Sequence, residues 1–220
     1  AEVTLTTAEQ RADYETMAAS TIEECDRLLD MINTTLVISR TEAGVQALQW
    51  QRIDIAGLVQ DAGRLFETIA RDKALHLSVT AGDPCFINGD ARMLQRMVAN
   101  LLDNAIRYTP QGGRIDITVQ PTPEGDVAVV FQDTGIGIRA ADLPRIFERF
   151  FRCDPSRSAS GTGLGLSLAQ AVAMAHGGEI TVQSEPGQGS TFQVLLPRNG
   201  DRIQEPEDDN QRRTPSRGKS

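Results

Sequence analysis

The sequence predicts an α+β fold, in which helices interleave with short strands that pair as hairpins. From Leu48 onward, short runs of alternating apolar and polar residues are separated by longer amphipathic segments. Two pairs of such runs flank turn sequences, at residues 121–125 and at the Pro-Gly-Gln-Gly sequence of residues 186–189. Hairpins among helices indicate this class rather than a doubly wound parallel sheet.

A long helix with an apolar stripe is expected in residues 11–40. Small and apolar side chains recur there at alternating spacings of four and three residues, as in a helical bundle. Such a helix needs a partner for its stripe, and a second copy of the chain is the simplest one. We expect the first residues to end a preceding helix and residues 6–9 to form a connecting turn, which makes this segment part of a helical hairpin. The stripe comprises Ala18, Ile22, Cys25, Leu29, Ile32, Leu36 and Ser39.

The remaining elements follow in chain order. The last 22 residues hold one aliphatic side chain and five charges of each sign, so we predict that they are disordered. The chain then divides into a partial dimerisation hairpin (1–45), a second domain (46–198) and a tail (199–220). In the second domain we expect strands at 48–53, 75–80, 85–88, 114–120, 126–132, 179–184 and 190–196, and helices at 55–72, from the N-cap Asp90 onward, and at 167–175 before Gly177 and Gly178.

The composition excludes several classes of protein. The chain has 220 residues with 22 Lys+Arg and 30 Asp+Glu, a formal net charge of −8. This acidic balance argues against nucleic-acid binding, which needs an excess of Lys and Arg on one face. No apolar run approaches the ~18 residues that cross a bilayer, and the three cysteines have neither disulfide nor zinc spacing. We therefore expect a soluble chain from a reducing compartment, and its start at Ala1 rather than Met suggests a piece of a longer protein.

The helix that follows Asp90 carries two amides and a guanidinium on one side. Asn100, Asn104 and Arg107 fall within about 60° of one another on a helical wheel. These groups could hold phosphate oxygens and a hydrated Mg²⁺ ion, which takes oxygen ligands. An ordinary solvated helix face has the same composition, so this pattern alone leaves both interpretations open.

Two glycine-rich segments could contact a nucleotide. Asp133, at the end of a strand, could accept a hydrogen bond from the amine of a nucleobase, and Gly135 and Gly137 would let the backbone approach the ring. A strand-ending turn has the same residues. The sequence of residues 161–169 runs from three alternating glycines into a helix, whose first N–H groups favour a phosphate. It is neither a Walker A loop nor a Rossmann fingerprint.

An aromatic segment lies between the two glycine-rich ones. Residues 147–152 read Phe-Glu-Arg-Phe-Phe-Arg, within an irregular stretch from 138 to 160 of the kind that forms lids. The three phenylalanines could equally belong to the core, with Arg149 and Arg152 solvated.

The order and spacing of these four segments resemble the N, G1, F and G2 boxes of the ATP-binding domain of sensor histidine kinases. The resemblance covers residues 48–197, and residues 1–45 resemble the end of the first helix and the second helix of that family's dimerisation hairpin. It implies a two-layer α/β sandwich of the GHKL (Bergerat) type, with ATP and Mg²⁺ as cofactors. It also implies a response regulator as partner, a homodimer, and a cytoplasmic fragment of a parent protein in the bacterial inner membrane.

The resemblance also implies roles for individual residues. Asn104 matches the residue that binds Mg²⁺, Asn100 supports it, and Asp133 matches the residue that recognises adenine. Arg107 and Tyr108 match a pair that contacts phosphates and adenine, and Arg152 matches a lid arginine that reaches the phosphates. The catalytic candidates are thus Asn100, Asn104, Arg107 and Arg152, and the nucleotide-binding candidates are Asn104, Arg107, Tyr108, Asp133, Gly135, Gly137, Gly161, Thr162, Gly163, Leu164 and Gly165.

One feature of the family is absent from the sequence. The family's phosphate acceptor is a histidine on the first hairpin helix, followed by an acidic residue. The chain has only His76, in a strand pattern, and His176, before a helix-ending Gly-Gly pair. We therefore expect the chain to bind Mg-ATP without phosphorylating itself, and the acceptor to lie elsewhere in the intact protein.

Two other functions remain open at this point. ATPases of the gyrase, heat-shock chaperone and mismatch-repair type share these boxes, but they hydrolyse ATP with a Glu one turn before the Mg²⁺-binding Asn, where this chain has Asn100. A catalytically silent, dimerising nucleotide sensor is the second alternative. Every motif residue named above is of the type that the kinase chemistry needs, so the sequence offers no support for a silent protein.

Overall fold

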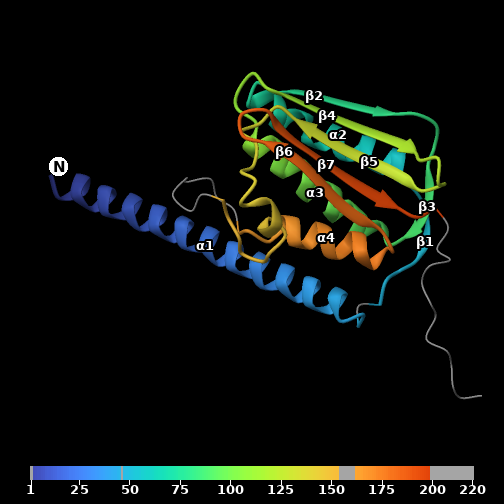
Figure 1. The fold of residues 1–220 in the computed structure, drawn as a ribbon. Helices are drawn as coiled ribbons and strands as arrows, with labels where there is room; N and C mark the ends of the chain where they lie inside the picture. The colour runs from blue at the N-terminus through green and yellow to red at the C-terminus, as the bar shows by residue number, and fades with distance from the viewer. Residues whose placement is uncertain (1, 46, 154–161, 199–220) are drawn as a thin grey trace, which may run out of the picture.

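A five-stranded mixed sheet, covered on one face by helices, forms the body of the molecule (Figure 1). The computed structural model describes residues 2–45, 47–153 and 162–198, and the structural statements below concern these residues. The predicted disorder of residues 199–220 and the predicted role of Gly161 lie outside them. The elements are α1 (Glu2–Glu42), β1 (Gln51–Asp54), α2 (Ile55–Asp72), β2 (His76–Ala81), β3 (Phe86–Gly89), α3 (Ala91–Tyr108), β4 (Arg114–Pro121), β5 (Val127–Asp133), the 3-10 turn η1 (Leu143–Arg145), α4 (Gly165–Ala175), β6 (Glu179–Glu185) and β7 (Gly189–Leu196).

The sheet has the strand order β2-β4-β5-β7-β6. β2 runs parallel to β4, and the other neighbours are antiparallel, including the predicted hairpins β4–β5 and β6–β7. β1 and β3 form a separate antiparallel pair. This arrangement confirms the α+β, two-layer prediction.

The core lies between the sheet and the helices. Alternate residues of the central strands are buried and face α2, α3 and α4, as the period of two in a half-covered sheet requires. The buried core includes Leu94, Met97, Val98 and Leu101 of α3, Leu168 and Val172 of α4, Ile115 and Ile117 of β4, Val129 and Phe131 of β5, and Phe192 and Val194 of β7.

Aspartate caps begin both helices that follow the small sheet. Asp54 accepts a hydrogen bond from the backbone N–H of Ala56, and the predicted N-cap Asp90 accepts from those of Arg92 and Met93. Each cap satisfies N–H groups that the first helical turn leaves without partners. The caps therefore fix where α2 and α3 start.

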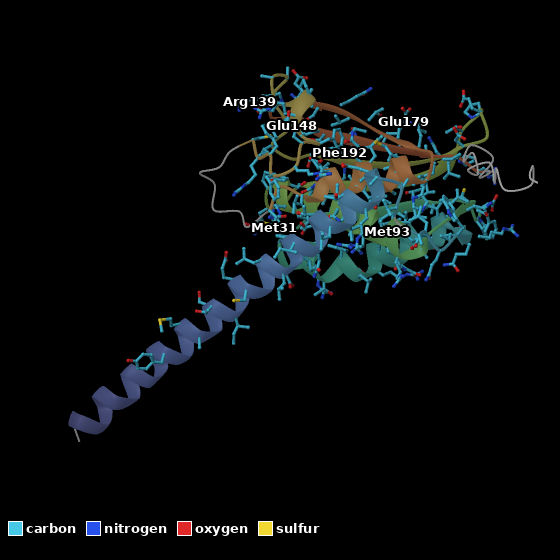
Figure 2. All side chains as sticks on the ribbon, turned by 90° about the horizontal axis from the view of Figure 1, so that it is seen from below. Met31, Met93, Arg139, Glu148, Glu179 and Phe192 are labelled. Atoms are coloured by element: carbon cyan, nitrogen blue, oxygen red, sulfur yellow. The ribbon has the colours of Figure 1, made fainter. Side chains whose placement is uncertain are left out.

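The N-terminal helix α1 is continuous from Glu2 to Glu42, so the predicted turn at residues 6–9 is wrong. These residues include no Gly or Pro, and Ala8 and Glu9 are good helix formers, so nothing local stops the helix. Figure 2 shows its first part projecting away from the domain, with Met31 where the helix meets it. The division into hairpin, second domain and tail stays a prediction.

The second half of α1 has two different faces. One face packs along α4, with Ile38 and Thr41 buried and Thr34 accepting a hydrogen bond from the Arg96 guanidinium (3.3 Å). At the end of the same face, Glu42 forms an ion pair with Arg149. The predicted apolar stripe points the opposite way, about 150° round the helix at 100° per residue. Its large members Ile22, Leu29, Ile32 and Leu36 are exposed.

None of the helices in the described ranges has the length and apolar composition that crossing a bilayer requires.

Candidate nucleotide-binding site

The polar face of α3 meets the first residue of α4. The Asn100 side chain donates to the carbonyl of Arg96 (2.7 Å). Its amide oxygen lies 2.9 Å from where a β-carbon on Gly165 would stand. A β-carbon there would force the Asn100 side chain to shift, so this arrangement of the two residues depends on the glycine. The contact between Asn100 and Gly165 thus joins α3, which carries the two asparagines, to the second glycine-rich segment at residues 161–169.

Asp133, the last residue of β5, is held as a buried hydrogen-bond acceptor. Its side chain is bonded by the backbone N–H groups of Gly135 (2.7 Å) and Ser190 (3.3 Å). Burial raises the pKa of this carboxyl, while these two hydrogen bonds act in the opposite direction. A fixed acceptor with few water contacts suits recognition of an amine on a planar base.

The first glycine-rich segment packs on the end of α3. A β-carbon on Gly135 would come within 2.8 Å of the Tyr108 carbonyl oxygen, and the same oxygen accepts a hydrogen bond from the Ile136 N–H (3.1 Å). Gly137 has a positive φ of +69°, and a side chain there would clash with the Glu185 carbonyl. Both predicted glycines are therefore required by close backbone approach.

The aromatic segment is bonded to the second glycine-rich segment. The N–H of Phe150 donates to the carbonyl of Gly163 (2.9 Å), and both residues have positive φ. Phe150 is 52% exposed, whereas Phe147 and Phe151 are partly buried against the core. Phe147 and Phe151 thus hold the segment against the core, as the core interpretation expects, while Phe150 faces outward, as a lid residue would. Arg152 is half-buried at its end, just before residues 154–161.

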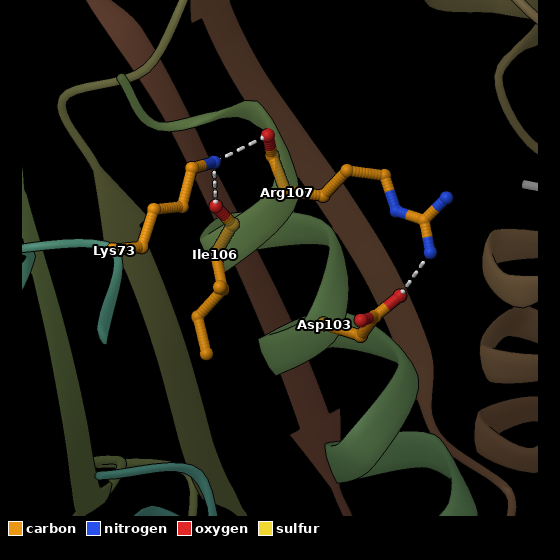
Figure 3. Close-up of polar contacts among 4 residues, drawn as sticks. All are labelled: Lys73, Asp103, Ile106 and Arg107. Carbon is orange, nitrogen blue, oxygen red and sulfur yellow. Dashed lines mark hydrogen bonds and ion pairs between the residues drawn. The ribbon is translucent and has the colours of Figure 1, made fainter. Parts of the chain in front are cut away.

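The groups suited to phosphate lie at the ends of α3 and α4. The Arg107 guanidinium is paired with Asp103 one turn earlier (2.9 Å), as Figure 3 shows. Tyr108 beside it is 45% exposed. In the described chain no side chain caps α4, which begins at Gly165 after Thr162, Gly163 and Leu164. Its first N–H groups are therefore available to an anion.

Asn104 has an amide oxygen that could serve as a single protein ligand to a cation. Its amide is half-buried and makes no hydrogen bond with any described residue. Across the described ranges, no group of three or more His, Cys, Asp or Glu side chains is placed to hold a metal. One amide oxygen suits Mg²⁺, which keeps waters and takes substrate phosphates as its other ligands.

The two histidines have the structural positions that their sequence contexts predict. His176 is the C-cap of α4 and is buried. Its Nδ1 lies 2.7 Å from the Val172 carbonyl oxygen, and its Nε2 accepts a hydrogen bond from the Asp90 N–H (3.0 Å). Its ring packs against Trp50 at 5.3 Å between centroids. His76 is exposed at the start of β2.

Two residues that support the site, Gly189 and Lys73, were not among those predicted from the sequence. Gly189 has a φ of +95°, and a side chain there would clash with the Asp133 carbonyl, so the glycine lets β7 pass beside the acceptor. Gly189 is the second glycine of the Pro-Gly-Gln-Gly turn, and that position in the turn was the sequence signal that could have identified it. Lys73, which bonds the end of α3, belongs to no motif.

Comparison with known proteins agrees with this geometry. The family described as histidine kinase-, DNA gyrase B- and HSP90-like ATPase matches residues 89–200. The sensor histidine kinase CusS of Escherichia coli O157:H7 is 33% identical over 201 residues, covering 90% of this chain and 41% of that protein. The sensor histidine kinase RppB of Synechocystis sp. is 38% identical over 190 residues, with coverages of 84% and 41%.

A solved structure extends the comparison to three dimensions. The crystal structure of full-length ShkA in complex with AMPPNP has a TM-score of 0.71 and 30% identity, covering 80% of this chain and 36% of that one. The chain thus spans less than half the length of the two curated relatives named above. It belongs to the family of histidine kinase-, DNA gyrase B- and HSP90-like ATPases, as the ATP-binding core of a sensor histidine kinase.

Proposed function

We propose that this site binds Mg-ATP and presents its γ-phosphate to a histidine of the dimerisation helices, for relay to an aspartate of a response regulator. One observation carries the proposal: four segments far apart in the sequence meet through the contacts Asn100–Gly165, Tyr108–Gly135 and Phe150–Gly163. Each contact joins a different pair of motif segments. The relative ShkA was crystallised with AMPPNP, which supports a triphosphate as the ligand.

The adenine end of the proposed site is Asp133. Its carboxylate accepts the exocyclic amine of the base, while the N–H groups of Gly135 and Ser190 fix its orientation. Desolvation makes this hydrogen bond stronger than it would be in water. Tyr108 and the backbone of Gly135 and Gly137 border the ring.

The phosphate end is formed by Arg107, Arg152, the loop residues Thr162, Gly163 and Leu164, and the N-terminus of α4 at Gly165. A bound Mg²⁺ would neutralise phosphate charge, and Asn104 would hold it, with Asn100 fixing the neighbouring turn. Phosphoryl transfer depends mostly on positioning and on stabilising charge at the phosphate oxygens. The guanidinium groups and helix N–H groups supply that charge. Arg107 then exchanges its contact with Asp103 for one with phosphate.

Neither histidine of the chain is proposed as the acceptor. His176 is buried with both ring nitrogens in hydrogen bonds, and His76 begins an edge strand of the sheet. Incubation with γ-labelled ATP is expected to leave both unlabelled. Acid-labile label on either residue would contradict this.

Dimerisation through α1 forms part of the proposal. The stripe of Ile22, Leu29, Ile32 and Leu36 is exposed on the side of α1 that faces away from α4, so a second copy can cover it without displacing the catalytic domain. Location of the parent protein in a bacterial membrane stays a prediction.

Steady ATP hydrolysis is the function against which the proposal must be tested. In hydrolysing relatives a Glu activates water one turn before the Mg²⁺-binding Asn. Here that position is Asn100, whose amide is committed to Arg96 and to the start of α4. An amide cannot act as general base. Sustained phosphate release by the purified chain would favour an ATPase instead.

The decisive experiment is calorimetry of Mg-ATP binding to Asn104→Ala, with Asn33→Ala, an exposed asparagine on α1, as the matched control. We expect the first variant to lose at least about tenfold in affinity and to lose its dependence on Mg²⁺. The control should bind like the unchanged chain. Equal affinities for the two variants would refute the site.

A further inference from the structure

The end of α3 is closed by a residue outside the four motif segments. An α-helix leaves its last four carbonyls without helical partners. In α3 the carbonyl of Ala105 accepts from the N–H and the hydroxyl of Thr109 (3.1 and 2.6 Å), and that of Tyr108 accepts from Ile136. The other two, those of Ile106 and Arg107, accept from the Lys73 ammonium at 2.6 and 2.8 Å (Figure 3).

Lys73 reaches α3 from a turn that is itself fixed. It is the C-cap of α2, and the next residue, Ala74, has a positive φ of +53°. The Leu75 N–H bonds back to Ala70 (2.8 Å), and the Ala74 carbonyl accepts from Gly112 in the loop after α3 (3.0 Å). The backbone from which the lysine side chain starts is therefore fixed, and the two hydrogen bonds to α3 must offset only the rotamer freedom of the side chain itself.

Two positively charged side chains, those of Lys73 and Arg107, lie near the C-terminal end of α3. A cation is favourable at a helix C-terminus, where the peptide dipoles leave partial negative charge. Burial, and next the charge of Arg107, hold the pKa of Lys73 below its usual range. The ammonium fixes the backbone of Arg107, and Asp103 holds the Arg107 guanidinium (2.9 Å).

We propose that Lys73 is a positioning residue for nucleotide binding, which fixes the last turn of α3 so that Arg107 meets the phosphates. This inference rests on the proposed function, since it needs Arg107 to contact phosphate. It differs from a purely structural role because its effect must pass through Arg107.

A double-mutant cycle on the full chain tests the proposal. Lys73→Met keeps the aliphatic stem without the donors, Arg107→Gln removes the phosphate contact, and the double variant combines them. Lys73→Arg restores a donor to both carbonyls, and Arg64→Met, on the exposed face of α2, is the matched control. The measurement is the calorimetric Kd for Mg-ATP, with circular dichroism as the check of folding. If Lys73→Met does not fold, Lys73→Gln replaces it.

We expect Lys73→Met to weaken Mg-ATP binding about tenfold and Lys73→Arg to recover most of it. The double variant should bind no more weakly than Arg107→Gln alone, because coupled residues are not additive. Multiplied effects in the double variant, or unchanged binding by a folded Lys73→Met, would overturn the inference alone. Unchanged binding by Arg107→Gln would overturn the phosphate role of Arg107 in the proposed function, and this inference with it.

Discussion

Asn100 on α3 and Gly165 on α4 lie so close that a β-carbon on the glycine would come within 2.9 Å of the amide oxygen. The glycine is therefore a spacing residue between two helices as well as part of a loop. Its backbone is not in the left-handed region that favours glycine, so a side chain at this position is opposed only by its contact with Asn100, which would have to shift.

Gly165→Ala is expected to separate stability from binding. Alanine also has less backbone freedom to lose than glycine on folding, which offsets part of the crowding. The displaced Asn100 should nevertheless weaken Mg-ATP binding by about fivefold or more. Calorimetry and thermal unfolding measure the two effects. Gly82→Ala is the control, since a β-carbon there would meet nothing within 4 Å, and equal binding by both variants would contradict the prediction.

Ile38→Ala and Leu36→Ala should have different consequences although both residues lie on α1. Ile38 is fully buried in the core, so its truncation should lower the free energy of unfolding by about 2–4 kcal/mol. Leu36 is 48% exposed, so its truncation should change stability by at most about 0.5 kcal/mol while weakening self-association. Urea unfolding and sedimentation equilibrium distinguish them. The prediction fails if Ile38→Ala is as stable as Leu36→Ala.

Thr41→Val should stabilise the protein. The Thr41 hydroxyl is buried and has no hydrogen-bond partner in the described part of the chain. Valine has the same shape without the unsatisfied group, so we expect a gain of about 1 kcal/mol, or about 3 °C in Tm. Thr35→Val is the control, because the Thr35 hydroxyl does bond the Met31 carbonyl (2.8 Å) and should bring no gain. A fall in Tm for Thr41→Val would be the contrary result.

The stability of the fold should depend on pH through His176. Burial lowers the pKa of this histidine, although the Val172 hydrogen bond and the charge of Asp90 act the other way. The folded protein therefore binds fewer protons than the unfolded chain below about pH 6.5. The free energy of unfolding should fall as the pH drops from about 6.5 and should be insensitive to this group above it.

Urea unfolding of His176→Gln between about pH 5.5 and 7.5 checks this. Glutamine can still accept from the Asp90 N–H but does not titrate, so the variant should show a shallower pH slope in this window. His76→Gln, on the exposed start of β2, should keep the original slope. Identical slopes for the two variants would exclude His176 as the cause.

Local signals in the sequence were enough for most elements. The helix expected at 55–72 has those bounds, and Asp90 is the N-cap of α3, because capping chemistry acts within a few residues. The parallel pairing of β2 with β4 was not predicted, since it joins strands that α3 and β3 separate in the chain. The continuous α1 shows the opposite error: a turn was expected where no residue breaks a helix.

The site could be predicted as motifs but not as contacts. The spacing of asparagines and glycines indicated positions where the backbone approaches closely, as at Gly135 and Gly137. Lys73 had no such signal. Its partners are backbone carbonyls 33 and 34 residues away. Every residue has such a carbonyl, so no residue type in the sequence indicates the contact.

The two-faced helix α1 has a mechanical consequence. It contacts two elements of the proposed nucleotide site, through Thr34 to Arg96 on α3 and through Glu42 to Arg149 in the aromatic segment. Turning α1 about its own axis would withdraw Ile38 from the core, at a cost of about 1.5–3 kcal/mol, and would break both polar contacts together. A rotation imposed at the N-terminal end of α1 would therefore act on α3 and on the aromatic segment at once, whereas a small sideways bend of the same end would leave both contacts in place.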